Sequence, residues 1–237
     1  MGRIFAVCSG NGGVGKSTVA LSLAVGTANK GYKTILLDAS GFSRSCDLIL
    51  GMQNIVVLDM LDIFKEQISI GSALYPVQNR DHLYFACASL YDEVSVSELS
   101  GIILALQTLC EVLVIDLPSG QIDIGVGIMK SGDERLLVVR PDDASMRAAE
   151  RIMKRLDGDQ AEVSLIINRV SRERLKKKAQ YDQDTVQSVL DRMVLGCIPE
   201  DSAVVEAEKK GKAAIESDGP SKAAFKGVVD KLLSGKV

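Results

Sequence analysis

A glycine-rich segment near the start of the chain limits the possible folds more than any other feature. Residues 10–18 read Gly-Asn-Gly-Gly-Val-Gly-Lys-Ser-Thr and match the pattern G-x-x-x-x-G-K-[ST]. An apolar run, Arg3–Ser9, precedes this segment, and a helical pattern, Lys16–Lys30, follows it. The order of strand, glycine loop and helix predicts a P-loop, in which glycines let successive backbone N–H groups approach an anion without a clash from a Cβ atom.

The residue types in this loop suit a nucleotide whose phosphates are bound to Mg²⁺. Lys16 brings positive charge to phosphate oxygens, and the Ser17 hydroxyl can ligate the metal. The following helix points the positive end of its dipole at the anion. A flexible glycine turn is the alternative interpretation. We therefore expect a nucleotide and Mg²⁺ to bind here. The expected contacts are Asn11, Gly12, Gly13, Val14, Gly15, Lys16, Ser17 and Thr18.

Short apolar runs alternate with helical patterns along almost the whole chain. Runs rich in Val, Ile and Leu are typical of strands that are covered on both faces. The further expected strands are Thr34–Asp38, Leu83–Cys87, Val112–Asp116, Arg135–Arg140, Val163–Asn168 and Met193–Cys197. The further expected helices are Val96–Cys110, Ser145–Leu156, Asp184–Arg192, Ser202–Lys210 and Ser221–Leu233. This alternation predicts an α/β fold in one domain, residues 1–237, with a mainly parallel sheet flanked by helices on both faces, as in P-loop NTPases.

Composition narrows the setting and the partners. Hydrophobic residues make up 46% and charged residues 25% of the chain, which is usual for a globular protein. The formal net charge of −3 argues against attraction of the whole surface to nucleic acid. The five cysteines include no CxxC pair, so neither a zinc site nor a cysteine-ligated cluster is indicated. No signal peptide or membrane span is predicted, and we expect a cytoplasmic location.

Two aspartates stand where expected strands end. Asp38 ends one apolar run, and Asp116 ends another and is followed by Leu-Pro-Ser-Gly. An acid in this position beside a P-loop can hold Mg²⁺ through its water shell. Gly120 would let the next loop contact the γ-phosphate through a backbone N–H. Capping of the following helix is the alternative role for each acid. We expect Ser17, Asp38 and Asp116 to form the metal site.

These motifs resemble those of the ParA/MinD family of P-loop ATPases, and most closely its MinD-like branch. Residues 9–18, with paired glycines before Val14, are similar to the family's deviant Walker A motif, and residues 116–120 are similar to its second switch, D-x-P-x-G. Four further segments are similar in the family's order: 48–51, 141–147, 168–169 and 198–201. The resemblance covers nearly the whole chain.

The resemblance implies an ATP-dependent switch. Two protomers would enclose two ATP molecules, and the homodimer would recruit a partner protein that positions cellular machinery such as a septum, flagellum, pilus or chromosome. It also implies hydrolysis of ATP to ADP and phosphate, with Lys16 and Asp38 as the catalytic residues.

The same resemblance implies an adenine pocket. Asn168 would hydrogen-bond the edge of the base, since its amide offers both a donor and an acceptor. Considered without the resemblance, Asn168 could equally be a turn residue. The remaining members of the implied pocket are Arg169, Pro199, Glu200 and Asp201.

Three positions depart from the family's pattern. Asn11 stands where a signature lysine reaches across the dimer, and Ser40 stands where a second aspartate orients the attacking water. Ala148 stands where the MinD branch often has an acidic residue. Hydrolysis depends on positive charge at the γ-phosphate and on placement of the water. We therefore expect ATP binding with slow or absent hydrolysis, unless a neighbouring cation such as Arg44 or Lys33 substitutes.

Two other functions stay open at this stage. A non-hydrolysing, ATP-bound scaffold or localisation factor is favoured by Asn11 and Ser40. A small-molecule kinase or ATP-dependent ligase on the same fold would need a pocket for an acceptor substrate, and no motif indicates one.

Two surface features bear on partners. The apolar residues of the last expected helix have the spacing of a core-facing stripe, and only residues 234–237 follow, so we expect no stable membrane anchor in this chain. A basic cluster consists of Arg172, Arg174 and Lys176–Lys178. It is typical of a solvated helix face, and contact with DNA phosphates is the alternative, which the negative net charge disfavours.

Overall fold

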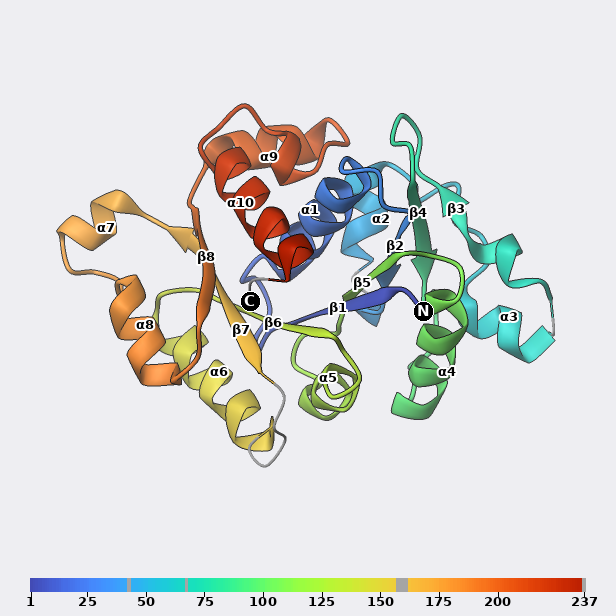
Figure 1. Cartoon of the computed structure of the whole chain (residues 1–237), viewed down its shortest axis with the longest axis horizontal. Helices are drawn as coiled ribbons and strands as arrows, with labels where there is room; N and C mark the ends of the chain where they lie inside the picture. Colours follow the sequence, from blue (N-terminus) through green and yellow to red (C-terminus); the bar gives the residue numbers. More distant parts are fainter. Residues whose placement is uncertain (42–43, 67, 157–161, 236–237) are drawn as a thin grey trace.

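The sheet is organised around β1 (Arg3–Cys8), the apolar run that precedes the glycine loop. The computed structural model describes residues 1–41, 44–66, 68–156 and 162–235, and helices cover both faces of the sheet (Figure 1). Within these residues the strands form one eight-stranded sheet in the order β3-β4-β2-β5-β1-β6-β7-β8. The other strands are β2 (Thr34–Asp38), β3 (Tyr75–Pro76), β4 (Leu83–Cys87), β5 (Val112–Asp116), β6 (Glu134–Val139), β7 (Val163–Val170) and β8 (Val194–Pro199).

Among the described residues, every strand pairing is parallel except that of β3 with β4. Parallel strands need a crossover between them, and helices supply it. The helices are α1 (Lys16–Ala28), α2 (Ser45–Leu50), α3 (Met60–Glu66), α4 (Val96–Gln107), α5 (Ile122–Met129), α6 (Asp143–Leu156), α7 (Arg172–Lys176), α8 (Gln183–Leu190), α9 (Ser202–Lys209) and α10 (Ser221–Ser234), with short 3-10 helices η2 (Ile70–Ala73) and η3 (Ala214–Glu216).

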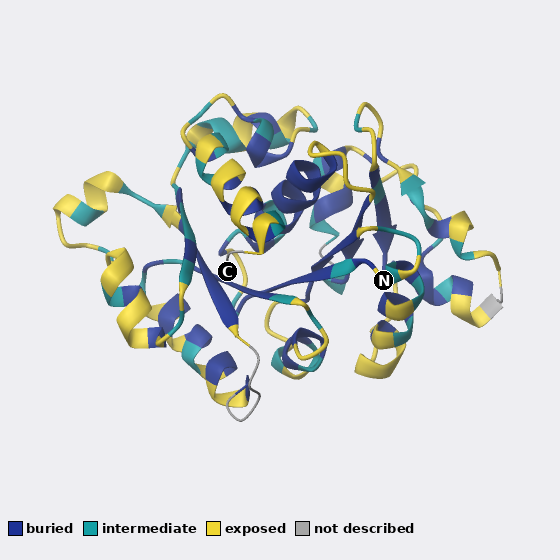
Figure 2. Cartoon of the chain, in the orientation of Figure 1, coloured by how far each residue is buried: buried dark blue, intermediate teal, exposed yellow. Residues whose placement is uncertain are grey.

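The core has two apolar layers, one on each face of the sheet. Successive residues of β1 alternate between them, so that Phe5 and Val7 belong to one layer and Ile4 and Ala6 to the other. Helices α1 and α10 cover the first layer, whereas α4, α5 and α6 cover the second (Figure 1). The strands are mostly buried, and α7 at one end of the molecule is largely exposed (Figure 2).

The expected fold class is confirmed, and each expected strand exists. The boundaries differ by a few residues: β7 extends to Val170 and β8 to Pro199, and α4 ends at Gln107 before the expected Cys110. Helix α1 ends at Ala28 before the expected Lys30, where Gly31 adopts a left-handed conformation with φ of 90°.

The last helix packs as its spacing predicts. Phe225, Val228, Val229 and Leu232 of α10 are all buried in the layer that α10 shares with α1. The expectation that residues 234–237 form no membrane anchor falls partly outside the described residues, since the structure describes the chain only to residue 235. In the described part of the chain, no helix has the length and apolar character needed to cross a bilayer.

The parallel arrangement brings the carboxyl ends of β1, β2 and β5 to the same edge of the sheet. Asp38 at the end of β2 is in register with Asp116 at the end of β5. The glycine loop leaves β1 beside them. Ligands of open α/β sheets bind at this edge, so the fold places the predicted motifs together.

Candidate nucleotide-binding site

The glycine loop between β1 and α1 has a backbone that requires glycine at specific positions. Gly13 and Gly15 adopt left-handed conformations, with φ of 76° and 90°. A Cβ atom on Gly15 would lie 2.2 Å from Nδ2 of Asn168, and one on Gly10 would lie 2.5 Å from backbone atoms of Ala148 in α6. The loop is therefore held closely between β7 on one side and α6 on the other.

A cavity of about 270 Å³ opens over this loop. Every residue expected to contact the phosphates lines it. The lining consists of Ser9, Asn11, Gly12, Gly13, Val14, Gly15, Lys16, Ser17, Thr18, Ser45, Ile49, Ser119 and Arg169. Residues 11–18 thus lie together in the wall of one cavity at the start of α1.

Lys16 and Asp116 form a buried ion pair below the cavity. The Lys16 ammonium donates to Oδ1 of Asp116, and their side chains are only 5% and 0% exposed. Burial alone would lower the pKa of Lys16, but the charge and hydrogen bond of Asp116 outweigh it and raise that pKa above its ordinary value. Lys16 thus carries the positive charge that a bound phosphate would need, and in this structure that charge is paired with the carboxylate of Asp116.

Asp38 is buried beside this pair. Its Oδ1 accepts hydrogen bonds from the backbone N–H and the hydroxyl of Ser40, at 2.9 and 2.5 Å. Its Oδ2 accepts from the backbone N–H of Cys46, in the first turn of α2, at 3.2 Å. Asp38 therefore also accepts a hydrogen bond from the first turn of the following helix, which is part of the capping role considered as an alternative. Burial is the largest cause that raises the pKa of Asp38, and the charge of Asp116 is the second. The hydrogen bonds from Ser40 and Cys46 lower this pKa, and the net result is a pKa of about 6.

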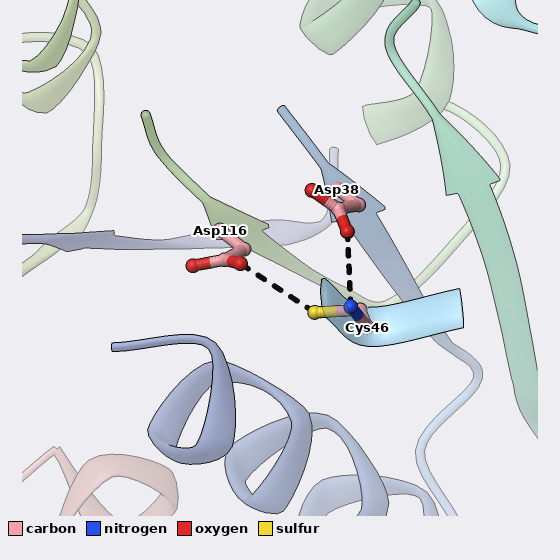
Figure 3. A group of neighbouring side chains, drawn as sticks. All are labelled: Asp38, Cys46 and Asp116. Carbon is pink, nitrogen blue, oxygen red and sulfur yellow. Dashed lines mark hydrogen bonds between the residues drawn. The ribbon is translucent and has the colours of Figure 1, made fainter. Parts of the chain in front are cut away.

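Cys46 lies between the two carboxylates (Figure 3). Its thiol contacts Oδ2 of Asp116 at 3.5 Å, and one ligand atom from each of Asp38, Cys46 and Asp116 lies within 4.8 Å of the others. Burial, with the charges of both aspartates, raises the pKa of Cys46 well above its ordinary value, so the side chain stays a neutral thiol. Mg²⁺ takes oxygen ligands, so the residues that fit it are the two aspartates together with Ser17 at the cavity wall.

A second cavity, of about 350 Å³, adjoins the first. The two share Gly15, Thr18 and Arg169 in their walls. The wall of the second cavity consists of Gly15, Thr18, Asn168, Arg169, Ile198, Pro199, Glu200, Asp201, Ser202, Val204, Val205, Glu208 and Phe225. All residues expected to surround a base thus lie together, at the ends of β7 and β8 and on α9, and they continue the cleft that begins at the P-loop.

Asn168 lines the second cavity and is hydrogen-bonded to the P-loop. Its Nδ2 donates to the backbone carbonyl of Val14 at 2.8 Å, and its Oδ1 accepts from the backbone N–H of Arg169 at 3.0 Å. An asparagine amide has two N–H donors and two acceptor lone pairs, so these bonds leave one of each. That remaining pair is what the edge of an adenine requires. Arg169 itself has a left-handed backbone with φ of 57°, an unusual conformation for a residue other than glycine.

The base-side wall is braced by Asp201. Its carboxylate caps α9 by accepting from the N–H of Ala203 at 3.0 Å. The same carboxylate accepts from the N–H and hydroxyl of Ser221, at 3.1 and 2.7 Å, at the start of α10. The chain from Pro199 to Asp201 is therefore fixed to two helices, which favours a preformed pocket.

The structure also locates the residues that depart from the family pattern. Asn11 lines the first cavity, and its side-chain oxygen is buried without a hydrogen-bond partner among the described residues. The hydroxyl of Ser40 is directed to Asp38. Lys33 immediately precedes β2, so it lies at the opposite edge of the sheet, where its ammonium is 5.6 Å from the ring of Tyr84. Lys33 is therefore too far from the P-loop end of the sheet to replace the missing lysine at the γ-phosphate.

Arg44, the other cation considered as a substitute, is ion-paired. Its Nε donates to Oδ2 of Asp47 at 2.8 Å, at the start of α2. The Arg44 backbone has φ of 38°. The guanidinium is thus engaged within its own helix turn, and a role at the γ-phosphate would require it to leave Asp47.

The basic cluster on α7 has the character of a solvated helix face. No residue of α7 is buried, and Lys177 forms an exposed ion pair with Glu173 at 2.6 Å. Exposed pairs of this kind contribute little to stability. The cluster lies beyond the end of β7 (Figure 1).

Two residues of the site were not foreseen. Cys46 contacts both Asp38 and Asp116, and Glu208 accepts a hydrogen bond of 2.7 Å from the hydroxyl of Thr18. Glu208 is 190 positions away from Thr18. Neither residue belongs to a local motif, and the contacts depend on the packing of α2 and α9 against the P-loop.

Comparison with known proteins gives a consistent result across the chain. The family model ParA, described as NUBPL iron-transfer P-loop NTPase, matches residues 1–233. The septum site-determining protein MinD of Helicobacter pylori is 29% identical over 249 residues, covering 100% of this chain and 92% of that protein. MinD of Neisseria meningitidis is 29% identical, covering 98% of this chain and 92% of that protein.

Solved structures resemble the fold over the same extent. A chain of the MinC:MinD cell division protein complex of Aquifex aeolicus matches with a TM-score of 0.88 and 25% identity, covering 98% of this chain and 96% of that one. MinD of Pyrococcus horikoshii, complexed with Mg-ADP, matches with a TM-score of 0.84 and 24% identity, covering 100% of this chain and 98% of that one.

Proposed function

The chain belongs to the ParA family of P-loop NTPases, as its match over residues 1–233 shows, and from that premise we propose that it is an ATP-dependent dimerising switch of the MinD type. In this proposal one domain, residues 1–237, binds ATP with Mg²⁺, pairs with a second copy and recruits a partner protein that positions cellular machinery. The observation that carries the proposal is that the cavity over the P-loop adjoins a second cavity at the ends of β7 and β8, with Gly15, Thr18 and Arg169 in the walls of both.

The phosphate end of the cleft supports triphosphate binding. The loop residues and the start of α1 line the cavity, where an anion would be stabilised by the helix dipole. In the described structure Lys16 is held by Asp116. A triphosphate would compete with Asp116 for this ammonium, and Asp116 would then be released toward the metal. Ser17, Asp38 and Asp116 would hold Mg²⁺, which when bound neutralises charge on the β- and γ-phosphate oxygens.

The base end supports adenine as the base. The remaining N–H and lone pair of Asn168 match the donor and acceptor pattern of the adenine edge. Arg169, Glu200 and the backbone of residues 199–201 would complete the pocket. The nucleotide would thereby contact β7, β8 and α9 as well as the P-loop.

Slow hydrolysis follows from the residues at positions 11 and 40. Asn11 can donate hydrogen bonds to a phosphate but brings no charge, and Ser40 is a weaker base than a carboxylate. Transition-state charge at the γ-phosphate is ordinarily stabilised by cations, which can be worth about 10³–10⁵ in rate. The two cations considered as substitutes are placed elsewhere, Lys33 at the opposite edge and Arg44 on Asp47. Lys16 and Asp38 remain the candidate catalytic residues.

The partner is proposed to be a protein. One relative is described as part of a MinC:MinD cell division complex, and the relatives of similar length are septum site-determining proteins. DNA is not proposed as the partner, because the net charge is −3 and the basic cluster on α7 is the only motif that favours it in the described chain. Retention on DNA that weakens steeply with salt would contradict this choice.

A combined measurement of mass and phosphate release tests the proposal. The molar mass of the full chain is measured by chromatography with light scattering in Mg-ADP, in Mg-ATP and in Mg²⁺ with a slowly hydrolysed ATP analogue. We expect a monomer in ADP, a dimer in the analogue, and slow phosphate release in ATP. An unchanged mass in all three nucleotides would contradict the dimerising switch, and rapid release would contradict slow hydrolysis.

A non-hydrolysing scaffold is the second candidate, because Asn11 and Ser40 favour it. The double substitution Asn11→Lys with Ser40→Asp separates the two functions. If the native chain turns ATP over slowly, the double variant releases phosphate at least about tenfold faster, since each change restores a group that acts in the transition state. A native chain that forms a stable ATP-bound dimer without any release supports the scaffold instead.

A further inference from the structure

Glu208 lies between the P-loop and the proposed base pocket. It is a residue of α9, and it lines the second cavity together with Gly15 and Thr18. Its carboxylate accepts the hydrogen bond of 2.7 Å from the Thr18 hydroxyl. Glu208 therefore stands beside the residue that follows the magnesium-binding serine of the P-loop, while the helix that carries it begins at the base pocket.

The helical spacing explains this placement. Asp201 is the N-cap of α9, and Glu208 lies seven residues later. Residues separated by seven positions lie on the same face of a helix, about two turns apart. Val204, between them on that face, also lines the cavity, whereas Glu206 is exposed and does not. The face of α9 thus leads along the cleft from the base end to the phosphate end.

Between the base and the phosphates of a nucleotide lies the ribose, whose vicinal hydroxyls are hydrogen-bond donors. A carboxylate is the matching acceptor, and acidic residues contact ribose hydroxyls in other nucleotide folds. The Thr18 bond uses Oε1 of Glu208, and a carboxylate has two oxygens with about four lone-pair sites, so it can accept further donors.

We propose that Glu208 is a specificity-determining residue that accepts a hydrogen bond from a ribose hydroxyl and so favours ribonucleotides over deoxyribonucleotides. This inference rests on the proposed function, because it places ATP in the cleft. A negative charge near a triphosphate is otherwise unfavourable for binding, since like charges repel. Loss of the Glu208 charge removes both this repulsion and the hydrogen bond to the sugar, and these two effects on the affinity for ATP oppose each other. The ratio of the affinities for ATP and deoxy-ATP is therefore the clearer readout, because the repulsion acts equally on both nucleotides.

The competing explanation is purely structural. The bond from Thr18 to Glu208 also fastens α9 to α1, and such a bond would stabilise the fold without any contact to a ligand. The two roles differ in one readout: a fastening bond changes the binding of ATP and deoxy-ATP by the same factor, whereas a sugar contact changes their ratio.

The test measures dissociation constants by calorimetry, with Mg²⁺ present, for ATP, 2′-deoxy-ATP and 3′-deoxy-ATP. The proteins are the native chain, Glu208→Gln and the control Glu206→Gln, which makes the same change of charge on an exposed position of α9. A hydrogen bond to a charged group implies that the native chain prefers ATP to at least one deoxy analogue by about tenfold or more. Glu208→Gln should reduce that preference to about twofold, and Glu206→Gln should keep it.

Equal affinities of the native chain for all three nucleotides would overturn the inference, and so would an unchanged preference in Glu208→Gln. If Glu208→Gln does not fold, Glu208→Asp takes its place. It withdraws the carboxylate by one methylene, and it should likewise reduce the preference for ATP over the deoxy analogues. Failure of the native chain to bind ATP at all would contradict the proposed function. Binding of ATP without discrimination between the sugars would contradict only the role of Glu208.

Discussion

The two ends of the cleft are built in opposite ways. The phosphate end comes mainly from one contiguous stretch, residues 11–18, to which Ser45, Ile49, Ser119 and Arg169 add parts of the wall. The buried side chains of Lys16 and Asp116 form an ion pair at this end. The base end is assembled from the ends of β7 and β8 and from α9, and its wall includes the exposed residues Arg169 and Glu200. The phosphate end is thus formed largely by local sequence, whereas the base end requires that β7, β8 and α9 have come together.

This difference has a consequence for function. Backbone N–H groups and a lysine recognise phosphate without regard to the rest of the ligand. Side chains such as Asn168 distinguish one base from another because they present donors and acceptors in a fixed order. Binding strength should therefore depend mainly on the phosphate end, and selectivity mainly on the base end.

The largest effect is expected from Lys16→Ala. The change removes the ammonium of the phosphate end, and it leaves Asp116 buried without its partner. Breaking a buried pair on one side destabilises proteins by about 3–5 kcal/mol. We expect no measurable heat on titration with Mg-ATP. Lys30→Ala, which removes a lysine from an exposed pair with Asp230, is the control and should bind as the native chain does. Native-like ATP affinity in Lys16→Ala would show that the phosphate end is misassigned.

A smaller effect is expected from Gly15→Ala, because Gly15 lies where the two ends of the cleft meet. The new Cβ would lie 2.2 Å from Nδ2 of Asn168, at a backbone φ of 90°. Strain at such a φ and overpacking together should lower the free energy of unfolding by about 2–4 kcal/mol. Gly13→Ala shares the positive φ but meets no atom within 4 Å, so it isolates the strain and should cost about 1–2 kcal/mol. Urea unfolding measures both, and equal costs would argue against the contact with Asn168.

The pH dependence of stability tests the electrostatics of the phosphate end. The pKa of Asp38 in the folded protein is about 6, raised from 3.8 by burial and then by Asp116. Between these values the folded state holds a proton that the unfolded state has released. The contribution of Asp38 to stability therefore falls as the pH rises from about 4 through 6, by up to about 3 kcal/mol. Unfolding of the nucleotide-free chain and of Asp38→Asn at pH 5 and 7.5 measures this difference. A native chain that loses no more stability than Asp38→Asn over this interval would contradict the burial of a charged Asp38.

The smallest effect is expected from Asn168→Ala at the base end. Loss of a neutral hydrogen bond to the base should weaken ATP binding by about 1 kcal/mol, or roughly fivefold, and should reduce the preference for ATP over GTP. Binding of inorganic tripolyphosphate, which has no base, serves as the matched measurement for the phosphate end and should change little. An equal loss for tripolyphosphate and ATP would mean that Asn168 acts through its bond to Val14 and not on the base.

The contrast between the two ends also explains what could be predicted from the sequence. The P-loop and the acids at the ends of β2 and β5 were predictable because short apolar runs and local glycines identify them. The contact of Glu208 with Thr18 was not, because it joins residues 190 positions apart and depends on the packing of α9. Cys46 was missed as a neighbour of Asp38 and Asp116 because α2 has six residues, too few to show a helical period.

The missed helix α5 has a different physical reason. It contains Gly125 and Gly127, and glycine disfavours helices when judged by propensity alone. In the folded chain a Cβ on Gly125 would lie 2.9 Å from Sγ of Cys8, and one on Gly127 would lie 3.0 Å from Val96. The glycines allow close packing against β1 and α4, so tertiary contacts outweigh propensity here. Strand β3 was missed because it has two residues, one of them Pro76, which an edge strand tolerates.

A crystal structure of the chain with Mg²⁺ and a slowly hydrolysed ATP analogue tests most directly whether the two ends form one site. The account predicts a single nucleotide with its triphosphate on the amides of residues 11–18, its base beside Asn168, and Lys16 moved from Asp116 to the phosphates. A nucleotide whose base lies away from β7 and β8, or a triphosphate bound while Lys16 remains on Asp116, would contradict it.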